Sequence, residues 1–451
     1  MEPHGAIILA RGKDQAVLEW HHDIPTRYFA TYEELEEAFR RRVRGLVPRY
    51  HAGTRVFWDD FQQLYERPLT TGGETCEAYI TSNPRDCLAF GTPFQVLQGA
   101  WLSAFRRDAA PTEEPVQVAE RFSLSDHLHQ SIRSLSGGET VRLALAKAYL
   151  LASCASRLTV ASPFSWLACE HWGDFRFLAA HYRACRTDVE LLALEGEDTL
   201  SPAAPDWHPD LAPVDFSWRL KDLSLDLGSL MDHLYDQPVR ATVASVDEPL
   251  SSPALFWGDN GQGKSLVAKA LASAIPYRGE AAIFGPEGPL RVRLVFQDVL
   301  NQTLMRSLRQ LVPREIADDA ARAYDDIRSG IQRRLPTLGS DMPSFEQRRQ
   351  GAAPLRLLEI KMLLTALRLA EPRTALILDE PDWGLSRDKA IAFVSAVVQA
   401  AHTRGIPVLL ISHKPWWRTV ARSVRVFRKT AAPGGEPLFR VRIAAETAGA
   451  S

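Results

Sequence analysis

The sequence predicts an α/β protein, and three observations point to that class. Short apolar runs of strand length recur along the chain, and several are followed by segments with helical character. Some of these strands end at polar residues, as strands do where an open α/β sheet builds a site. The clearest is Ala254-Leu-Phe-Trp257, which enters a G-x-x-x-x-G-K-S loop and then a helix.

Each residue type in this loop suits a nucleotide polyphosphate. Its glycines let successive backbone N–H groups point into one concavity, and the following helix adds its N-terminal N–H groups and positive dipole end. The lysine can reach the terminal phosphates, and the serine hydroxyl can bind Mg2+. We expect the whole loop to bind nucleotide: Gly258, Asp259, Asn260, Gly261, Gln262, Gly263, Lys264 and Ser265.

Composition limits the remaining possibilities. A chain of 451 residues is too long for one ordinary core, and 45% hydrophobic with 24% charged residues is typical of soluble globular proteins. The net charge of −2 gives no global basic field, so nucleic acid is not indicated as a partner. The five cysteines lack C-x-x-C spacing, and no apolar run or leader suits a membrane. We expect a cytoplasmic protein with reduced, mostly buried thiols. If it works at the inner face of a membrane, a partner protein must span that membrane.

Three further apolar strands end at residues with catalytic potential. Asp379 and Glu380 end one strand, His413 ends another, and Gln297 follows a third. Singly, a carboxylate pair is often a helix cap and a lone histidine is usually structural, but their order behind a phosphate loop favours catalysis. We expect Mg2+ at Ser265, Gln297 and Asp379. Glu380 would polarise the attacking water, His413 would meet the γ-phosphate, and Gln297 would sense metal and water.

The second half resembles an ATP-binding cassette (ABC) ATPase, and Leu135-Ser-Gly-Gly-Glu139 resembles that family's signature motif. The resemblance covers about 215–430 strongly and 80–200 patchily. It implies a P-loop NTPase fold with two tandem ABC-type domains, each with a mostly parallel sheet core and a helical subdomain. In this family two cassettes pack head to tail, and each ATP with its Mg2+ lies between one phosphate loop and the other cassette's signature.

On this resemblance we expect a degenerate ABC-type domain at 1–205, a linker at 206–214, the ATPase domain at 215–430 and a tail at 431–451. Prolines are so dense between 199 and 213 that neither a helix nor a strand ladder can continue there. In the first half we expect strands at 5–10, 16–20, 157–161 and 189–194, helices at 31–44 and 92–107, and a mixed segment at 115–122.

The two halves can be overlaid as an internal repeat on their central strands. The overlay places Ala161 and Ser162 where Asp379 and Glu380 stand, and Glu195 where the histidine stands. The first half also has no glycine-rich loop before its helix at 31–44. The first half has therefore lost the groups that bind phosphate and metal.

The second half has lost its own signature instead. Leu355-Arg-Leu-Leu-Glu359 occupies the place of the motif, so Arg356 replaces the serine and two leucines replace the glycines. The resemblance then implies an intramolecular pseudo-dimer with one complete ATP site. The first half would contribute Ser136, Gly137, Gly138 and Glu139 to it.

The adenine-stacking residue stays open between Phe216, Trp218 and Tyr235. The work that ATP drives also has three candidates. We expect the energising subunit of a transporter with separate membrane subunits docking near Gln297, because Leu294-Val-Phe-Gln-Asp298 resembles importer cassettes. A soluble mechanochemical factor, in metalloenzyme maturation or on ribosomes or DNA, is the alternative, and an ATP-dependent regulatory switch is the third. Near-neutral charge argues against ribosome or DNA work.

Overall fold

The computed structural model forms two compact units, the first mainly from Leu18–Asp198 and the second mainly from Thr199–Asp226 and Val239–Ser451. Each is an α/β unit, as the sequence predicts. The structure describes the following residues: 6–11, 14–19, 24–42, 48–51, 54–57, 76–88, 91–105, 111–132, 135, 137–167, 171–195, 212, 214–226, 240–259, 261–297, 299, 312–339, 342–350, 355–431 and 438–445. The predicted linker lies almost wholly outside these residues.

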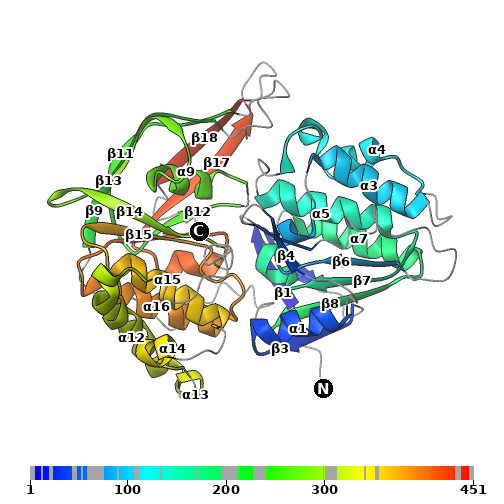
Figure 1. The fold of residues 1–451 in the computed structure, drawn as a ribbon. Helices are drawn as coiled ribbons and strands as arrows, with labels where there is room; N and C mark the ends of the chain where they lie inside the picture. The colour runs from blue at the N-terminus through cyan, green and yellow to red at the C-terminus, as the bar shows by residue number, and fades with distance from the viewer. Residues whose placement is uncertain are drawn as a thin grey trace. The chain divides into compact units, whose positions relative to one another are not determined.

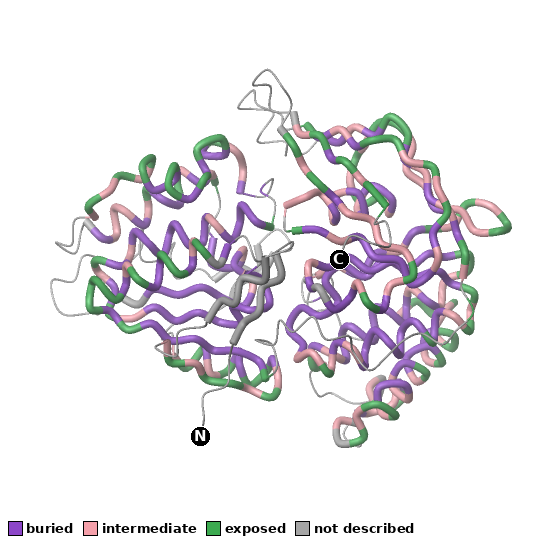
Figure 2. The backbone as a smooth tube through the Cα atoms, turned by 180° about the vertical axis from the view of Figure 1, so that it is seen from behind, coloured by how far each residue is buried: buried purple, intermediate pink, exposed green. Residues whose placement is uncertain are grey.

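The first unit is built on a four-stranded sheet in which all neighbours are parallel (Figure 1). Its strand order is β3 (Thr26–Phe29), β8 (Asp188–Leu194), β7 (Ala155–Ala161), β6 (Cys76–Ile80). Most side chains of β7 and β8 are buried (Figure 2), as expected for parallel strands covered on both faces. The main helices are α1 (Tyr32–Arg42), α3 (Pro93–Phe105), α4 (Pro115–Arg121), α5 (Gly137–Leu151) and α7 (Trp172–Ala184).

Local signals account for the predicted helices of this unit. Thr31 caps α1, since its Oγ1 accepts the backbone N–H of Glu34 at 3.2 Å. The helix expected at 92–107 is α3, and the segment called mixed is the helix α4. The two expected N-terminal strands are β1 (Ala6–Arg11) and β2 (Asp14–Glu19), which pair with each other, and β4 (Pro48–His51) pairs with β5 (Thr54–Phe57).

The second unit contains a ten-stranded mixed sheet. Its order is β10 (Arg240–Val243), β18 (Leu438–Ala445), β17 (Ser423–Ala431), β12 (Ala254–Trp257), β16 (Val408–Ser412), β15 (Thr374–Asp379), β14 (Gly288–Val295), β13 (Tyr277–Gly285), β9 (Val214–Asp226), β11 (Val246–Ser252). The predicted parallel sheet is its centre, from β14 to β17, and antiparallel strands extend it. The strand β10, at one end of this order, also pairs with β9, near the other end. The strand β18 falls in the predicted tail.

Helices cover both sides of the parallel strands in the second unit. Figure 1 shows α12, α15 and α16 packed together on one side, with α9 on the other. Their bounds are α9 (Lys264–Leu271), α12 (Ala317–Arg334), α15 (Leu357–Leu369) and α16 (Arg387–His402), with α13 (Pro336–Gly339) and α14 (Phe345–Gln350) between α12 and α15.

The strand order agrees with the internal repeat. The parallel order β6-β7-β8-β3 in the first unit matches β14-β15-β16-β12 in the second. The turn after β7 and the turn after β15 each begin with a left-handed residue, Ser162 at φ 49° and Glu380 at φ 47°. This match supports the overlay of the acidic pair on Ala161 and Ser162.

The sheet register corrects the second half of that overlay. Ala161 pairs with Leu192, whereas Asp379 pairs with Ile411. His413 lies two residues after Ile411, and Leu194 lies two residues after Leu192. Leu194, and not Glu195, therefore corresponds to the histidine. The error arose because runs of leucine and isoleucine can slide by one residue in a sequence overlay, whereas strand pairing fixes the register.

The connection from β3 to α1 is much shorter than the phosphate loop of the second unit. Only residues 30 and 31 connect β3 to α1, whereas residues 258–263 connect β12 to α9. A two-residue connection cannot form a concavity of backbone N–H groups. This agrees with the sequence Pro25-Thr-Arg-Tyr-Phe-Ala30, which has no glycine before the helix α1.

Two expectations about the cellular setting can be compared with the described residues. No helix among them is long and apolar enough to cross a membrane. The described thiols are all free, but only Cys87 is buried, while Cys154 is half-buried and Cys185 is exposed. The prediction of mostly buried thiols is therefore wrong for Cys185, which caps the carboxyl end of α7 at the surface.

Candidate functional site

The glycine-rich loop follows the buried strand β12 and requires glycine for two reasons. Gly258, Gly261 and Gly263 have φ angles of 146°, 80° and 95°, which strain any residue with a Cβ atom. A Cβ at Gly258 would lie 2.9 Å from the carbonyl oxygen of Phe427, and one at Gly263 would lie 2.8 Å from Cγ2 of Val441. Asn260, also expected in the site, lies outside the described residues.

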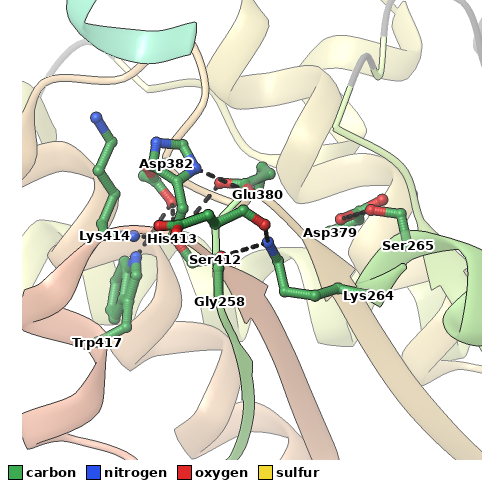
Figure 3. Close-up of polar contacts among 11 residues, drawn as sticks. Gly258, Lys264, Ser265, Asp379, Glu380, Asp382, Ser412, His413, Lys414 and Trp417 are labelled. Carbon is green, nitrogen blue, oxygen red and sulfur yellow. Dashed lines mark hydrogen bonds and ion pairs between the residues drawn. The ribbon is translucent and has the colours of Figure 1, made fainter. Parts of the chain in front are cut away.

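Lys264 occupies the centre of this loop (Figure 3). Its ammonium group donates hydrogen bonds to the carbonyl oxygens of Gly258 at 2.5 Å and Asp259 at 2.8 Å, and the residue is 4% exposed. Gln262 has a different role, because its Oε1 accepts the backbone N–H of Lys429 at 2.6 Å. The Gln262 side chain therefore ties the loop to β17, and Lys264 is a buried cation within the loop.

Ser265 and Asp379 form the expected magnesium pair. The Ser265 hydroxyl, in the first turn of α9, donates to Oδ1 of Asp379 at 2.9 Å. Burial and then the charge of Glu380 raise the pKa of Asp379 to about 6. Two adjacent buried carboxylates favour a cation, and a hydroxyl with a carboxylate provides the hard oxygen ligands that Mg2+ prefers. The residues present therefore fit this metal.

Gln297 lies two residues beyond the carboxyl end of β14, beside β15, and is half-buried. Within the described ranges it makes no hydrogen bond to Ser265 or Asp379. The structure thus places Gln297 at the predicted edge of the sheet without joining it to the metal pair.

Glu380 and His413 form the expected catalytic pair. Nδ1 of His413 lies 3.1 Å from Oε1 of Glu380, and their side chains are 8% and 9% exposed. Burial opposes ionisation of Glu380, but the charge and hydrogen bond of His413, with Lys264 and Lys414, lower its pKa overall. Glu380 is therefore a carboxylate at neutral pH, as a base for water must be.

The second ring nitrogen of His413 has no partner in the described part of the chain. Nε2 is buried and forms no hydrogen bond there. A protonated imidazole donates from both nitrogens, so Nε2 can donate to a phosphate oxygen while Nδ1 stays bonded to Glu380.

Three buried residues that the sequence analysis missed hold this pair in place (Figure 3). Oδ1 of Asp382 accepts the Ser412 hydroxyl at 3.3 Å and the indole N–H of Trp417 at 3.1 Å. The Ser412 hydroxyl also lies 3.4 Å from Oε2 of Glu380. The spacing of Asp382, two residues after Glu380, was a usable signal, whereas nothing in the sequence singles out Trp417.

Two of the three adenine-stacking candidates are wrong. Phe216 and Trp218 lie in β9 and are 5% and 0% exposed. The Trp218 indole N–H donates to Glu248 at 3.2 Å, and its ring packs 4.9 Å from that of Phe256. These aromatics belong to the core of the second unit. Tyr235 lies outside the described residues.

In the first unit the signature segment begins a helix. The helix α5 starts at Gly137, which is exposed, with Gly138 buried behind it. The Glu139 carboxylate is buried, with Oε1 3.5 Å from Nε2 of His127, and Arg85 donates to the carbonyl oxygen of Leu135 at 3.0 Å. Arg85 and His127 are supporting residues that the sequence analysis missed. Ser136 lies outside the described residues.

The degraded signature of the second unit begins its helix at the same point. The helix α15 starts at Leu357, the third residue of the segment, as α5 starts at the third residue of its own. Arg356 is the N-cap of α15 and is exposed. The equivalence of the two segments inferred from the sequence therefore agrees with the helix starts.

In the second unit, five predicted side chains come together at the carboxyl ends of the parallel strands: Lys264, Ser265, Asp379, Glu380 and His413. Open α/β sheets bind ligands at this edge. A positive loop, a metal pair and a carboxylate–histidine pair can together bind a metal-bound polyphosphate and take a proton from water.

No protein-family model matches the chain, and no curated protein matches its sequence. Among solved structures, RNase-L Inhibitor aligns with a TM-score of 0.44 and 15% identity over 81% of this chain and 74% of that one. UvrA2 from Deinococcus radiodurans aligns with 0.45 and 15% over 72% and 53%. The cbiO1 protein from Clostridium perfringens, part of the ABC transporter complex cbiONQ, aligns with 0.33 and 18% over 50% and 87%. All three TM-scores are below 0.5, so the site itself must support any function.

Proposed function

We propose that this chain is an ABC-type ATPase that binds one Mg-ATP and hydrolyses its terminal phosphoanhydride bond in the second unit. The observation that carries the proposal is the joint placement of the loop around Lys264, the Ser265–Asp379 pair and the Glu380–His413 pair at one sheet edge. Each group alone has a structural explanation, but the three together match what phosphoryl transfer to water requires.

The residues divide the reaction between them. The loop N–H groups and Lys264 bind the phosphates, and Ser265 and Asp379 would hold Mg2+, which neutralises phosphate charge when bound. The Glu380 carboxylate takes a proton from the attacking water while the water oxygen bonds to the γ-phosphorus. The bond from that phosphorus to the bridging oxygen breaks, which releases ADP and phosphate, while His413 fixes Glu380 and donates to a γ-phosphate oxygen.

We propose that the first unit completes this site with its signature segment, Ser136 to Glu139, within one chain. The helix α5 offers its N-terminal N–H groups directly after Ser136, which suits a terminal phosphate. The first unit lacks a phosphate loop and the second lacks glycines at 357 and 358, so the retained parts make one composite site. The domain boundaries proposed with it are 1–205, 206–214, 215–430 and 431–451.

Titration calorimetry with Mg-ATP tests the number of sites. The Glu380→Gln protein, which should bind without turnover, is expected to take up one ATP per chain. Lys264→Ala should abolish this heat, because the loop loses its buried positive charge, whereas Lys221→Ala removes an exposed lysine of β9 and should change nothing. Two equivalent ATP molecules per chain would contradict the single site.

Activity per molecule should not change with protein concentration, because closure within one chain is intramolecular. A rise in specific activity on concentration would show that two chains must meet.

We further propose that the cycle performs work on a partner instead of serving as a slow switch, because the base Glu380 and its histidine are both retained. Separate membrane subunits that dock near Gln297 and a soluble macromolecular target are the two partner classes. Affinity purification of the ATP-locked Glu380→Gln protein, followed by identification of membrane or soluble partners, separates them. Wild-type turnover that stays negligible with every partner recovered would favour the regulatory switch.

A further inference from the structure

One face of strands β10, β18 and β17 gathers exposed arginines. Arg428 of β17 lies directly opposite Arg442 of β18, and Thr430 lies opposite Arg440. Arg440 in turn pairs with Thr242 of β10, two residues after Arg240. Paired residues and residues two apart share one face of a sheet, so these four arginines point to the same side.

The opposite face of the same strands is core. Ala241, Phe427 and Val441 alternate with the arginines along the three strands, and each is 1% exposed. In Figure 1, β17 and β18 lie side by side, and Arg428 and Arg442 are exposed beside the buried residues Phe427 and Val441. The orientation of the arginines away from the core is therefore fixed by the packing beneath them.

The row extends across two further strands. Ser224 of β9 pairs with both Thr242 and Arg278 of β13, which places exposed Arg278 on the same face. From β13 to β17 the row crosses four strand spacings, about 20 Å in all. We call Arg240, Arg278, Arg428, Arg440 and Arg442 the arginine face.

Two acidic residues adjoin the row by register: Asp226 of β9 pairs with Arg240, and Glu280 follows two residues after Arg278, where it pairs with Arg219. None of the five guanidinium groups forms an ion pair or donates a hydrogen bond within the described ranges of the chain. Arg219, on a neighbouring part of the sheet, differs, because it pairs with Asp247 at 2.9 Å and Glu280 at 3.4 Å. Like charges directly opposite on antiparallel strands destabilise the pair, so Arg428 beside Arg442 is unfavourable unless an anion binds there.

The chemistry of the face matches phosphate groups in series. Arginine binds phosphate with two parallel hydrogen bonds, so a row of guanidinium groups suits a row of phosphates. Arg440 and Arg442 are separated by about 7 Å along β18, and neighbouring strands repeat the charge every roughly 5 Å. A single phosphate would use one or two arginines, whereas a continuous phosphate backbone can use the whole row.

We propose that the arginine face binds the phosphate backbone of a single-stranded nucleic acid. The whole-chain charge of −2 does not oppose this, because binding depends on the local charge, and five arginines lie together on one surface. The proposal goes beyond ATP hydrolysis and favours a soluble mechanochemical factor over a transporter subunit. None of the five residues belongs to the ATP site.

Fluorescence anisotropy with labelled oligonucleotides of about 20 nucleotides, one of RNA and one of DNA, tests this proposal. The triple variant Arg428→Ser/Arg440→Ser/Arg442→Ser should bind at least about tenfold more weakly than the wild type, because three phosphate contacts are lost. The slope of log affinity against log salt should fall by about 2, since each contact to a single strand contributes roughly 0.7. The RNA and DNA arms decide which nucleic acid binds better.

The matched control removes the same net charge from arginines that have carboxylate partners. Arg41 and Arg322 are exposed and Arg219 is half-buried; they pair with Glu37, Asp319 and Asp247 respectively. Arg41→Ser/Arg219→Ser/Arg322→Ser should therefore leave binding almost unchanged. An Arg428→Lys/Arg440→Lys/Arg442→Lys protein should keep the salt slope and lose part of the affinity, because lysine cannot form the bidentate contact.

Several results would overturn the proposal. They are absence of wild-type binding at low salt, equal losses in both serine triples, or complete displacement of the oligonucleotide by polyglutamate or by anionic phospholipid vesicles at matched charge. The melting temperature of the Arg428→Ser/Arg440→Ser/Arg442→Ser protein should stay level or rise, since like-charge repulsion is removed; a lower value would mark the face as structural. Turnover measured in the same preparations should match the wild type, so failure of the ATPase proposal can be told apart from failure of this one.

Discussion

Replacing Glu380 by glutamine is the most informative change to the site. Glutamine keeps the size of the side chain and an oxygen that can accept from His413, but it cannot take a proton from water. Removing a general base lowers turnover by about a hundredfold or more, equivalent to at least about 2.7 kcal/mol of barrier. The fold should survive, because a neutral hydrogen bond replaces a charged one at a cost of about 1–2 kcal/mol.

Binding should respond in the opposite direction. The Glu380 charge helps to raise the pKa of Asp379, so its removal lowers that pKa and leaves Asp379 more fully ionised at neutral pH. An ionised Asp379 is the better magnesium ligand. We therefore expect Mg-ATP affinity equal to or higher than that of the wild type, with turnover largely lost.

Steady-state phosphate release and titration calorimetry measure the two effects separately. Glu315→Gln, an exposed substitution in the second unit, is the matched control and should change neither. Turnover of Glu380→Gln within tenfold of the wild type, with Mg-ATP still bound, would refute the assignment of Glu380 as the base. Lost binding together with lost turnover would show that Glu380 mainly holds the site together.

Three further changes test other parts of the site. Ser136→Arg, which copies the degraded motif, should abolish hydrolysis and leave the melting temperature normal, while Arg356→Ser should change little. If Arg356→Ser lowers phosphate release more than Ser136→Arg does, the complete and the degraded sites have been assigned the wrong way round. Gly263→Ala should remove ATP binding in calorimetry, because a Cβ there meets Val441 at 2.8 Å and the φ of 95° is strained; binding within threefold of the wild type would show that the loop can relax. Asp382→Ala leaves the buried Trp417 indole N–H without its acceptor, and should lower the unfolding free energy in urea by about 1–3 kcal/mol. Asp382→Asn keeps one acceptor oxygen and should lose less unfolding free energy. Equal losses in the two variants would mean that the hydrogen bond to the acceptor contributes little to stability.

The sequence by itself determined the parts of this protein whose chemistry is local. A phosphate loop needs glycine at positive φ, then lysine, then a hydroxyl at the start of a helix, so the loop at 258–265 can be identified from its letters alone. Buried parallel strands read as apolar runs, and polar residues at their ends therefore predicted Asp379, Glu380 and His413 correctly as one group. The lack of a glycine-rich loop before α1 was visible in the same way, whereas the strand β3 that precedes this helix was not predicted.

Tertiary structure decided whatever depends on strand pairing or burial. Register moved the counterpart of His413 from Glu195 to Leu194, because a run of leucines carries no register of its own. Burial removed Trp218 as an adenine platform, since an aromatic residue in a strand looks the same in sequence whichever face it occupies. The arginine face is the extreme case. Its five residues are spread between positions 240 and 442, and only the pairing of β13, β9, β10, β18 and β17 brings their charges onto one surface.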